Sequence, residues 1–352
     1  MFIDAVGTAV PAARYTQREC WEALRGTPQF AALRGPSRLL LERVLTGEQG
    51  VRSRHLALEG LAEAFAIDPD VLAGRYARHA PELATRAAHR ALAKAGLAAQ
   101  DIDALVVSTC TGYLCPGLSS YVAERLELRA DALGLDLVGQ GCGAALPNLR
   151  TAEALLAAGR AEHVLCICVE VCSAALYIDD DPGVLVSGCL FGDGAAAAVA
   201  SRAPCAGSAR VEWIDAVSLV DPGERESLRM ETRGGLLRNL LSREVPQIAA
   251  EHAAALLHGT LERHGLAREE IREWIWHAGG RSVLERLRAA TGLEERHTRR
   301  SADVLARFGN LSSPFVLFVL AQTLEERGAP GWWWMSSFGA GFSCHGALLR
   351  VA

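Results

Sequence analysis

Residues 138–145 read Val-Gly-Gln-Gly-Cys-Gly-Ala-Ala and place Cys142 between two apolar stretches. The stretch before it, 133–138, has the composition of a buried strand, and the stretch after it, 149–158, has the apolar spacing of a helix. Glycines on both sides of the cysteine permit a tight turn and a close approach of a substrate. A helix that begins here directs free N–H groups at the sulfur, which favours the thiolate. The segment therefore predicts a reactive cysteine, with a buried structural thiol as the alternative.

Along the rest of the chain, the spacing of apolar residues alternates between that of helices and that of strands. Helices are predicted at 16–24, 37–45, 81–95, 148–158, 247–264, 282–287 and 314–327. Strands are predicted at 104–109, 133–138, 164–171, 195–201, 211–220, 274–276, 332–338 and 343–350. Because the alternation begins again after the loop at 204–207, we expect two related halves, 1–203 and 204–352, packed into one body.

The composition is that of a globular protein: 352 residues, 50% hydrophobic, with a net charge of −5. Arginines are mixed with acids, so no nucleic-acid partner is expected. The first residues do not form a secretion signal, and no stretch reaches the roughly 18 apolar residues of a membrane span. The ten cysteines lack the paired spacing of a disulfide framework or a metal site. We therefore expect a cytoplasmic protein with reduced thiols, no membrane segment and no metal.

Two further residues stand at positions typical of an active site. His277 ends a predicted strand and precedes a glycine turn, and Asn310 lies in a tight loop before an apolar helix. Taken singly, each has a structural alternative: a buried histidine, and a turn residue or helix cap. With Cys142 they supply a nucleophile, an imidazole and an amide donor, which suffice to form a thioester and stabilise an oxyanion.

The order Cys, His, Asn occurs both in papain-like hydrolases and in thiolase-fold condensing enzymes. A papain-like enzyme carries its cysteine near the mature N-terminus, whereas 141 residues precede Cys142 here. The chain resembles the type III polyketide synthases, the chalcone synthase-like branch of the thiolase superfamily, over nearly its whole length. The resemblance rests on five motifs in the same order: Gly139 to Cys142, Leu190 to Ala196, Trp276 to Gly280, Gly309 to Ser313 and Phe338 to Gly341.

The resemblance implies a five-layered α/β/α/β/α fold and the chemistry of a condensing enzyme. Cys142 would take an acyl starter from coenzyme A and hold the growing chain. His277 and Asn310 would orient malonyl-CoA and stabilise the enolate formed by loss of carbon dioxide, with no cofactor. Repeated condensation and cyclisation would yield an aromatic or pyrone product. The family further implies a homodimer.

Other residues of the resemblance concern the substrate pocket. Phe191 matches a gatekeeping phenylalanine between the coenzyme A tunnel and the reaction cavity. A second gatekeeping phenylalanine is expected where the chain has Arg238 and Asn239. The pocket positions are Cys110, Cys172, Ala175 and Ser312, of which the first three fall near threonines of plant relatives. A less polar wall favours a longer aliphatic starter over a coumaroyl group.

The entrance for coenzyme A is assigned to basic side chains. Arg52, Arg54 and His55 occupy a basic segment of the family, and Arg281 follows the glycine turn after His277. Two alternatives in function remain. A ketoacyl carrier-protein synthase III would extend once, but typically shows His-Gln-Ala-Asn where residues 277–280 read His-Ala-Gly-Gly. A thioester hydrolase or noncatalytic relative would form no carbon–carbon bond.

Overall fold

The computed structural model describes residues 1–47, 50–207 and 210–352. Within these residues, nine strands form one hydrogen-bonded sheet in the order β11-β12-β13-β8-β1-β7-β6-β4-β5. Its strands are β1 (Phe2–Ala9), β4 (Ala104–Thr109), β5 (Leu133–Val138), β6 (His163–Glu170), β7 (Gly194–Ser201), β8 (Val211–Val220), β11 (Ile271–Trp276), β12 (Gly331–Gly339) and β13 (Ser343–Val351). Two small antiparallel pairs complete the strands: β2 (Arg14–Thr16) with β3 (Ser53–His55), and β9 (Leu228–Arg233) with β10 (Leu236–Leu241).

The α-helices lie between these strands along the chain. They are α1 (Gln17–Leu24), α2 (Pro28–Ala32), α3 (Gly35–Thr46), α4 (Pro69–Ala95), α5 (Leu118–Leu126), α6 (Ala145–Ala157), α7 (Pro182–Leu190), α8 (Val245–His264), α9 (Arg281–Thr291), α10 (Glu295–Phe308) and α11 (Phe315–Glu325). None of the helices in the described ranges combines the length and the apolarity needed to span a bilayer.

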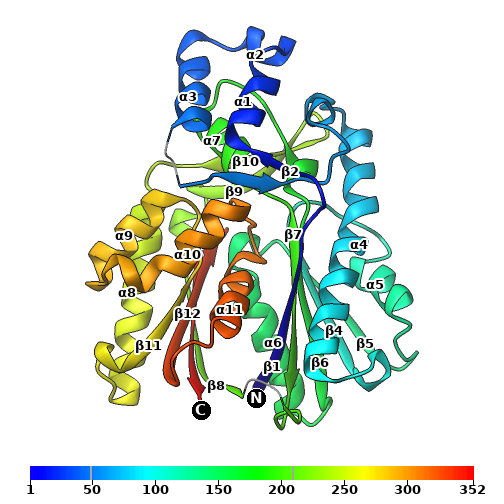
Figure 1. Ribbon diagram of the computed structural model, residues 1–352, viewed down its shortest axis with the longest axis vertical. Helices are drawn as coiled ribbons and strands as arrows, with labels where there is room; N and C mark the ends of the chain where they lie inside the picture. The colour runs from blue at the N-terminus through cyan, green and yellow to red at the C-terminus, as the bar shows by residue number, and fades with distance from the viewer. Residues whose placement is uncertain (48–49, 208–209) are drawn as a thin grey trace.

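The molecule is layered, and two helices occupy its centre. α6 contacts β4, β6 and β7 on one side and β12 and β13 on the other, while α11 contacts β1 and β7 as well as β11 and β12. α4 covers β1, β6 and β7 from outside, and α8 covers β8, β12 and β13 (Figure 1). α11 is apolar almost all round because it is buried from both sides. The expected five layers of helix, sheet, helix, sheet and helix are confirmed.

The two parts of the sheet are joined at one end. β1 pairs with β7 over most of its length but with β8 only through Phe2 and Ile3. Beyond this short ladder the parts separate and make room for α6 and α11. The predicted division between residues 203 and 204 falls in the connection between β7 and β8, and two related halves remain a prediction.

The sequence patterns missed several elements. β1 was overlooked because Asp4, Gly7 and small residues dilute its apolar pattern, although the strand lies at the centre of the sheet. The helix expected to begin at Pro81 in fact begins at Pro69 and contains that proline. α10 was missed because its exposed side is densely charged. The hairpin β9–β10 was missed because its two strands carry arginines and acids within the apolar alternation.

Candidate active site

Cys142 lies in a single 3₁₀ turn, Gly141–Gly143, between β5 and α6. Gly141 has φ +57, a left-handed conformation that favours glycine. The turn packs directly on the backbone at Gly339: a Cβ there would lie 2.5 Å from the Gly143 nitrogen and 2.6 Å from the Gln140 oxygen. The Ser337 hydroxyl donates to the Gly143 oxygen at 3.0 Å. The position of the thiol thus depends on the end of β12.

His277 follows β11, and its backbone N–H donates to the Ser336 oxygen at 2.9 Å. Its ring is 1% exposed and lies edge-on between the rings of Phe315 and Phe338, with centroids 5.2 and 4.9 Å away. Neither ring nitrogen has a hydrogen-bond partner among the residues that the structure describes. Buried polar atoms are rarely left unpaired, so the ring is placed to receive a partner from outside the chain.

Asn310 lies in the loop between α10 and α11 and is also buried. Its Nδ2 donates to the Gly279 oxygen at 3.3 Å, and its Oδ1 accepts from the Ser312 N–H at 2.8 Å. Its backbone N–H donates to the Leu190 oxygen at 2.8 Å, and its own oxygen accepts from the Gly192 N–H at 3.0 Å. This short parallel bridge joins the Asn310 loop to the segment that carries Phe191.

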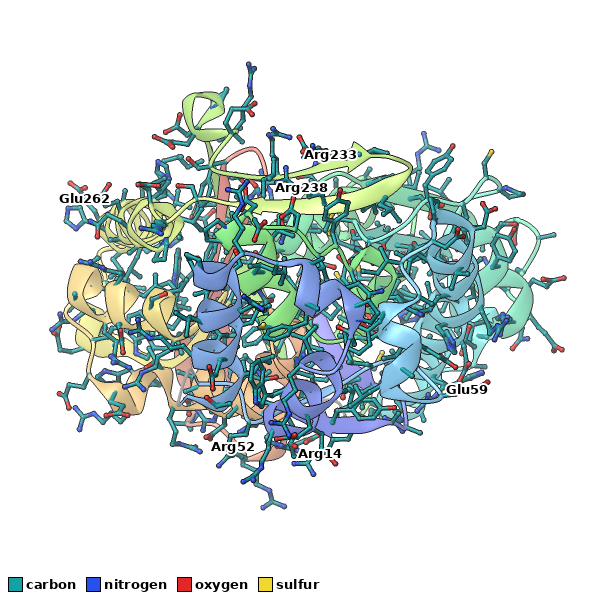
Figure 2. The ribbon with its side chains drawn as sticks, turned by 90° about the horizontal axis from the view of Figure 1, so that it is seen from above. Arg14, Arg52, Glu59, Arg233, Arg238 and Glu262 are labelled. Atoms are coloured by element: carbon teal, nitrogen blue, oxygen red, sulfur yellow. The ribbon has the colours of Figure 1, made fainter. Side chains whose placement is uncertain are left out.

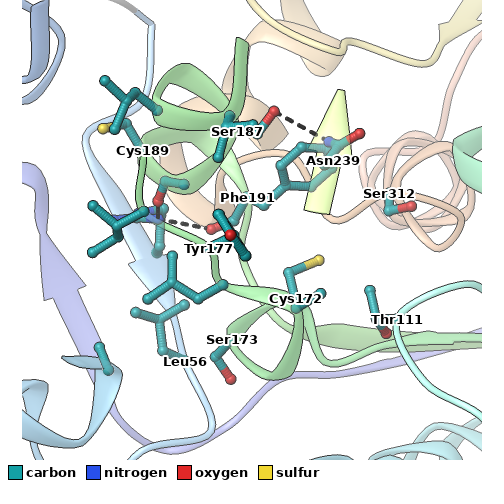
Figure 3. A pocket seen from close by; sticks show the side chains of 18 of the residues that line it. Leu56, Thr111, Cys172, Ser173, Tyr177, Ser187, Cys189, Phe191, Asn239 and Ser312 are labelled. Carbon is teal, nitrogen blue, oxygen red and sulfur yellow. Dashed lines mark hydrogen bonds between the residues drawn. The ribbon is translucent and has the colours of Figure 1, made fainter. Parts of the chain in front are cut away.

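Two cavities meet at Cys142. The outer cavity is lined by Cys142, His277 and Asn310. The inner cavity is lined by the predicted pocket residues Cys110, Cys172, Ala175 and Ser312 (Figure 3). Four residues line both cavities: Cys142, Phe191, Leu228 and Asn239. The structure therefore brings the three candidate catalytic residues together and places Phe191 at the junction, where a gate would have to stand.

A buried carboxyl group supports the inner cavity and was missed by the sequence reasoning. Glu170, at the end of β6, is fully buried and accepts from the N–H groups of Cys110 and Thr111 at 3.0 and 3.1 Å. The Ser313 hydroxyl donates to it at 2.6 Å. Burial raises the pKa of Glu170, and these donors oppose the shift. The sequence signal that could have identified Glu170 is its position as an acidic residue at the end of an apolar strand.

Burial favours the neutral form of both the Cys142 thiol and the His277 imidazole. The surrounding protein desolvates the Cys142 sulfur and raises its pKa to about 12, against the smaller opposing effect of a hydrogen bond with Ser312. Desolvation lowers the pKa of His277 to about 3. The shift in the pKa of Cys142 is opposite in direction to the lowering expected at the start of α6, because desolvation is its largest cause. Either charge can form only with a compensating charge beside it.

The residues assigned to coenzyme A do not form one surface. The prediction that Arg54 contacts coenzyme A is wrong. Arg54 is 6% exposed, and its Nη1 donates to the oxygens of Gly188 and Phe191 at 2.7 and 2.9 Å. A guanidinium so placed caps the end of α7 and cannot meet a phosphate at the surface. His55 is half-buried, with Nδ1 2.8 Å from the Pro11 oxygen.

Arg52 and Arg281 are exposed, and Figure 2 shows Arg52 at the surface beside Arg14. Arg281 pairs with Glu285 at 2.9 Å. Neither side chain lines the two cavities described above, but Arg243 and Arg286 line the outer one and are exposed. Sequence reasoning missed both arginines because Arg243, just before α8, and Arg286, on α9, come to line one cavity only in the folded chain.

The residues that the structure describes contain no group of three or more histidine, cysteine or acidic side chains arranged to hold a metal ion. All ten cysteines are free.

Comparison with known proteins gives the family. The family model described as FAE1/type III polyketide synthase-like protein matches residues 65–251, and the C-terminal domain of chalcone and stilbene synthases matches 219–352. The 1,3,6,8-tetrahydroxynaphthalene synthase of Streptomyces peucetius subsp. caesius is 33% identical over 99% of this chain and 92% of its own length. The 3,5-dihydroxyphenylacetyl-CoA synthase of Streptomyces toyocaensis is 28% identical over 92% of this chain and 83% of its own length.

Solved structures agree. PKS-I from the brown alga Ectocarpus siliculosus superposes with a TM-score of 0.90 at 28% identity, covering 99% of this chain and 98% of that one. The 1,3,6,8-tetrahydroxynaphthalene synthase of Streptomyces coelicolor A3(2) has a TM-score of 0.88 at 24% identity, which shows the same fold. The chain has the thiolase fold and belongs to the type III polyketide synthases, condensing enzymes that extend acyl thioesters repeatedly and cyclise the product.

Proposed function

We propose that this enzyme condenses an acyl-CoA starter with malonyl-CoA, using Cys142 as nucleophile and His277 and Asn310 as donors to the developing enolate. These three residues line the outer cavity together, and both nitrogens of His277 lack a partner within the described part of the chain, which supports the proposal. The geometry suits substrates that supply carbonyl oxygens. No cofactor is required for decarboxylation, because the charge that develops is an enolate, which hydrogen-bond donors can stabilise.

Loading begins with a neutral thiol. Cys142 Sγ attacks the starter carbonyl, the bond from that carbonyl to the coenzyme A sulfur breaks, and the thiol proton passes through His277 to the leaving sulfur. Because burial disfavours thiolate and imidazolium singly, the two charges form together and are consumed together. The acyl group then points into the inner cavity.

Extension follows in the outer cavity. Malonyl-CoA loses carbon dioxide, and the two electrons of the broken carbon–carbon bond form an enolate whose oxygen accepts from His277 and from Asn310 Nδ2. The enolate carbon attacks the Cys142 thioester, the bond to Sγ breaks, and the thiolate released takes up one proton from solvent, since the original thiol proton left with coenzyme A. Within the described ranges, Asn310 Nδ2 donates only to the Gly279 oxygen, at 3.3 Å, so its second N–H is left for the substrate.

Coenzyme A would enter from the side of α8 and α9. Arg243 and Arg286 supply two exposed cations at the outer cavity. We assign the binding of the coenzyme A phosphates to these two arginines in place of Arg54. Arg52, His55 and Arg281 remain predictions as phosphate contacts.

The starter proposed for the inner cavity is aliphatic. Cys110, Cys172 and Ala175 all line this cavity, and further lining residues are apolar: Leu24, Leu41, Leu45, Leu61 and Phe65. A straight acyl chain would bury its methylenes here without leaving a carbonyl unpaired.

A homodimer and a cytoplasmic location complete the proposal. β5 is an edge strand of the sheet, and Leu133 and Val138 on it are 44% and 49% exposed. An open, partly apolar edge is a ready site for pairing with a second copy of the chain. The free cysteines suit a reducing compartment.

The donor roles predict selective loss of decarboxylation. His277→Ala and Asn310→Ala should each lose about a hundredfold in release of carbon dioxide from malonyl-CoA, the usual effect of removing one oxyanion donor. Cys142→Ala should still decarboxylate but should show no acyl adduct by intact mass. Near-normal decarboxylation in both donor variants would contradict the mechanism. A persisting adduct in Cys142→Ala would move the nucleophile elsewhere, and a product from a single extension would favour a carrier-protein synthase III activity.

The raised thiol pKa predicts the pH dependence of alkylation. Since the pKa of Cys142 is about 12, the thiol is protonated at neutral pH. The rate of its modification by iodoacetamide should rise about tenfold per pH unit from about pH 7 to about pH 10, because only the thiolate reacts. Peptide mass spectrometry isolates Cys142 from the other cysteines, with Cys142→Ala as the blank. A rate already constant below neutral pH would show a thiolate at rest.

The apolar inner cavity predicts a dependence on starter length. Each buried methylene contributes about 0.8 kcal/mol, so kcat/KM should rise roughly fourfold per carbon until the cavity is full. Cys172→Phe should shift the preference to short starters while malonyl-CoA decarboxylation is retained. If wild type prefers acetyl or malonyl starters and Cys172→Phe changes only the overall rate, the aliphatic starter is wrong.

The exposed edge predicts the oligomeric state. Light scattering should give wild type twice the mass of one chain, and Leu133→Lys should weaken or abolish the dimer because a charge on β5 opposes edge pairing. Leu39→Lys changes an even more exposed leucine, on α3, and should leave the mass unchanged. A single-chain mass for wild type would refute the dimer.

A further inference from the structure

The hairpin β9–β10 covers the junction of the two cavities. Two hairpin residues, Leu228 and Asn239, line both cavities. The other residues that line both are Phe191 and Cys142, from elsewhere in the chain. Any chain that grows on Cys142 therefore passes Asn239. An aromatic side chain at this junction would narrow the passage by bulk alone. An amide instead offers hydrogen bonds.

Asn239 is tied to the helix that ends at Phe191. Its Nδ2 donates to the Ser187 hydroxyl at 3.1 Å, and that hydroxyl donates to the Gly183 oxygen at 2.8 Å (Figure 3). The Phe191 N–H in turn donates to the Ser187 oxygen at 3.1 Å. An asparagine amide has two N–H donors and one acceptor. One donor is used, and Asn239 forms no other side-chain hydrogen bond within the described chain.

Arg238, the preceding residue, points to the opposite face of β10 and is held by three carboxylates. Its Nε donates to Asp179 at 2.9 Å, its Nη1 to Glu231 at 2.8 Å and its Nη2 to Asp181 at 3.3 Å. The side chain is only 11% exposed, and its guanidinium carbon lies 5.9 Å from the ring centre of Tyr177. Partly buried, multiply bonded arginines hold position far better than surface ion pairs.

The two residues fasten β10 to α7 at two places. Asp181, one partner of Arg238, caps the start of α7 by accepting from the Gly183 N–H at 2.8 Å. Asn239 contacts the same helix six residues further along, at Ser187. The backbones also touch between these points, since a Cβ at Gly183 would lie 2.3 Å from the Leu241 oxygen. Movement of β10 is therefore coupled to Phe191 at the end of α7.

We propose that Asn239 and Arg238 form a polar gate: Asn239 binds a carbonyl of the growing poly-β-keto chain, and Arg238 positions the strand that carries it. The ligand class is a β-ketoacyl thioester, whose carbonyls lose water on passing the junction and need donors there. The free N–H of Asn239 is such a donor. This inference rests on the proposed function, because only an extending enzyme passes a chain through the junction.

The experiment compares the chain lengths of the products that wild type and variants form after each has been loaded with the same starter. Wild type, Asn239→Leu and Arg238→Met are acylated with one starter, given malonyl-CoA, and the products are resolved by mass spectrometry. Loss of one useful hydrogen bond should raise the ratio of early-released to fully extended product up to about tenfold, which corresponds to about 1.4 kcal/mol. Arg233→Met is the matched control: it removes one positive charge from the exposed tip of the same hairpin and should leave the ratio unchanged (Figure 2).

A double variant separates positioning from general damage. If Arg238 acts through Asn239, Arg238→Met should shift the ratio in the same direction, and adding it to Asn239→Leu should cause no further shift. Arg238→Lys should restore part of the wild-type ratio, because one ion pair can still form. Should Arg238→Met not fold, Asp179→Asn weakens the same contact and should shift the ratio likewise.

Equal product ratios in wild type and Asn239→Leu would overturn the gate while leaving the proposed function intact. Strictly additive effects of the two substitutions would overturn the positioning role of Arg238. If wild type neither loads a starter nor decarboxylates malonyl-CoA, the proposed function fails and the gate falls with it.

Discussion

The close backbone contact between the Cys142 turn and Gly339 is the constraint on which the site depends. Cys142 comes from the strand and helix of the first half, whereas His277 and Asn310 come from the second. Two peptide backbones can approach this closely only where no Cβ intervenes, and a Cβ on Gly339 would lie 2.5 Å from the Gly143 nitrogen. The contact sets the depth of the thiol in the outer cavity, and α6, which starts there, continues as the central layer.

Desolvation governs the chemistry of the cavities. Cys142, His277 and Glu170 are all titratable, and in each case burial is the largest cause of the pKa shift and favours the neutral form. The same low polarity strengthens each donor that meets a developing negative charge, so the cost of a protonated resting thiol is offset in the transition state. The edge-on phenylalanines around His277 exclude water and hold the ring without using its nitrogens.

α7 connects the chemical site with the substrate passage. Its C-terminal end is held by Arg54, its last turn leads to Phe191, and the backbone around Phe191 pairs with Asn310. The hairpin β9–β10 holds the start of α7 through Asp181 and its second half through Ser187. The Asn310 loop, Phe191 and the hairpin β9–β10 are therefore connected through hydrogen bonds to α7. This connection explains how a substitution at Arg238 could change the product ratio although Arg238 does not contact the product.

The sequence by itself determined the family, the layered fold and the three central residues. Cys142, His277 and Asn310 could be found because each stands at a local boundary with glycine nearby, and local patterns record such boundaries. Only the tertiary structure decided what surrounds them. Arg54 lies in a short basic segment but points inward, while Arg243 and Arg286 come to line one cavity only in the folded chain. The neutral thiol was also beyond sequence reasoning, because desolvation depends on atoms contributed by distant segments, whereas the opposing helix dipole is local and therefore visible in the sequence.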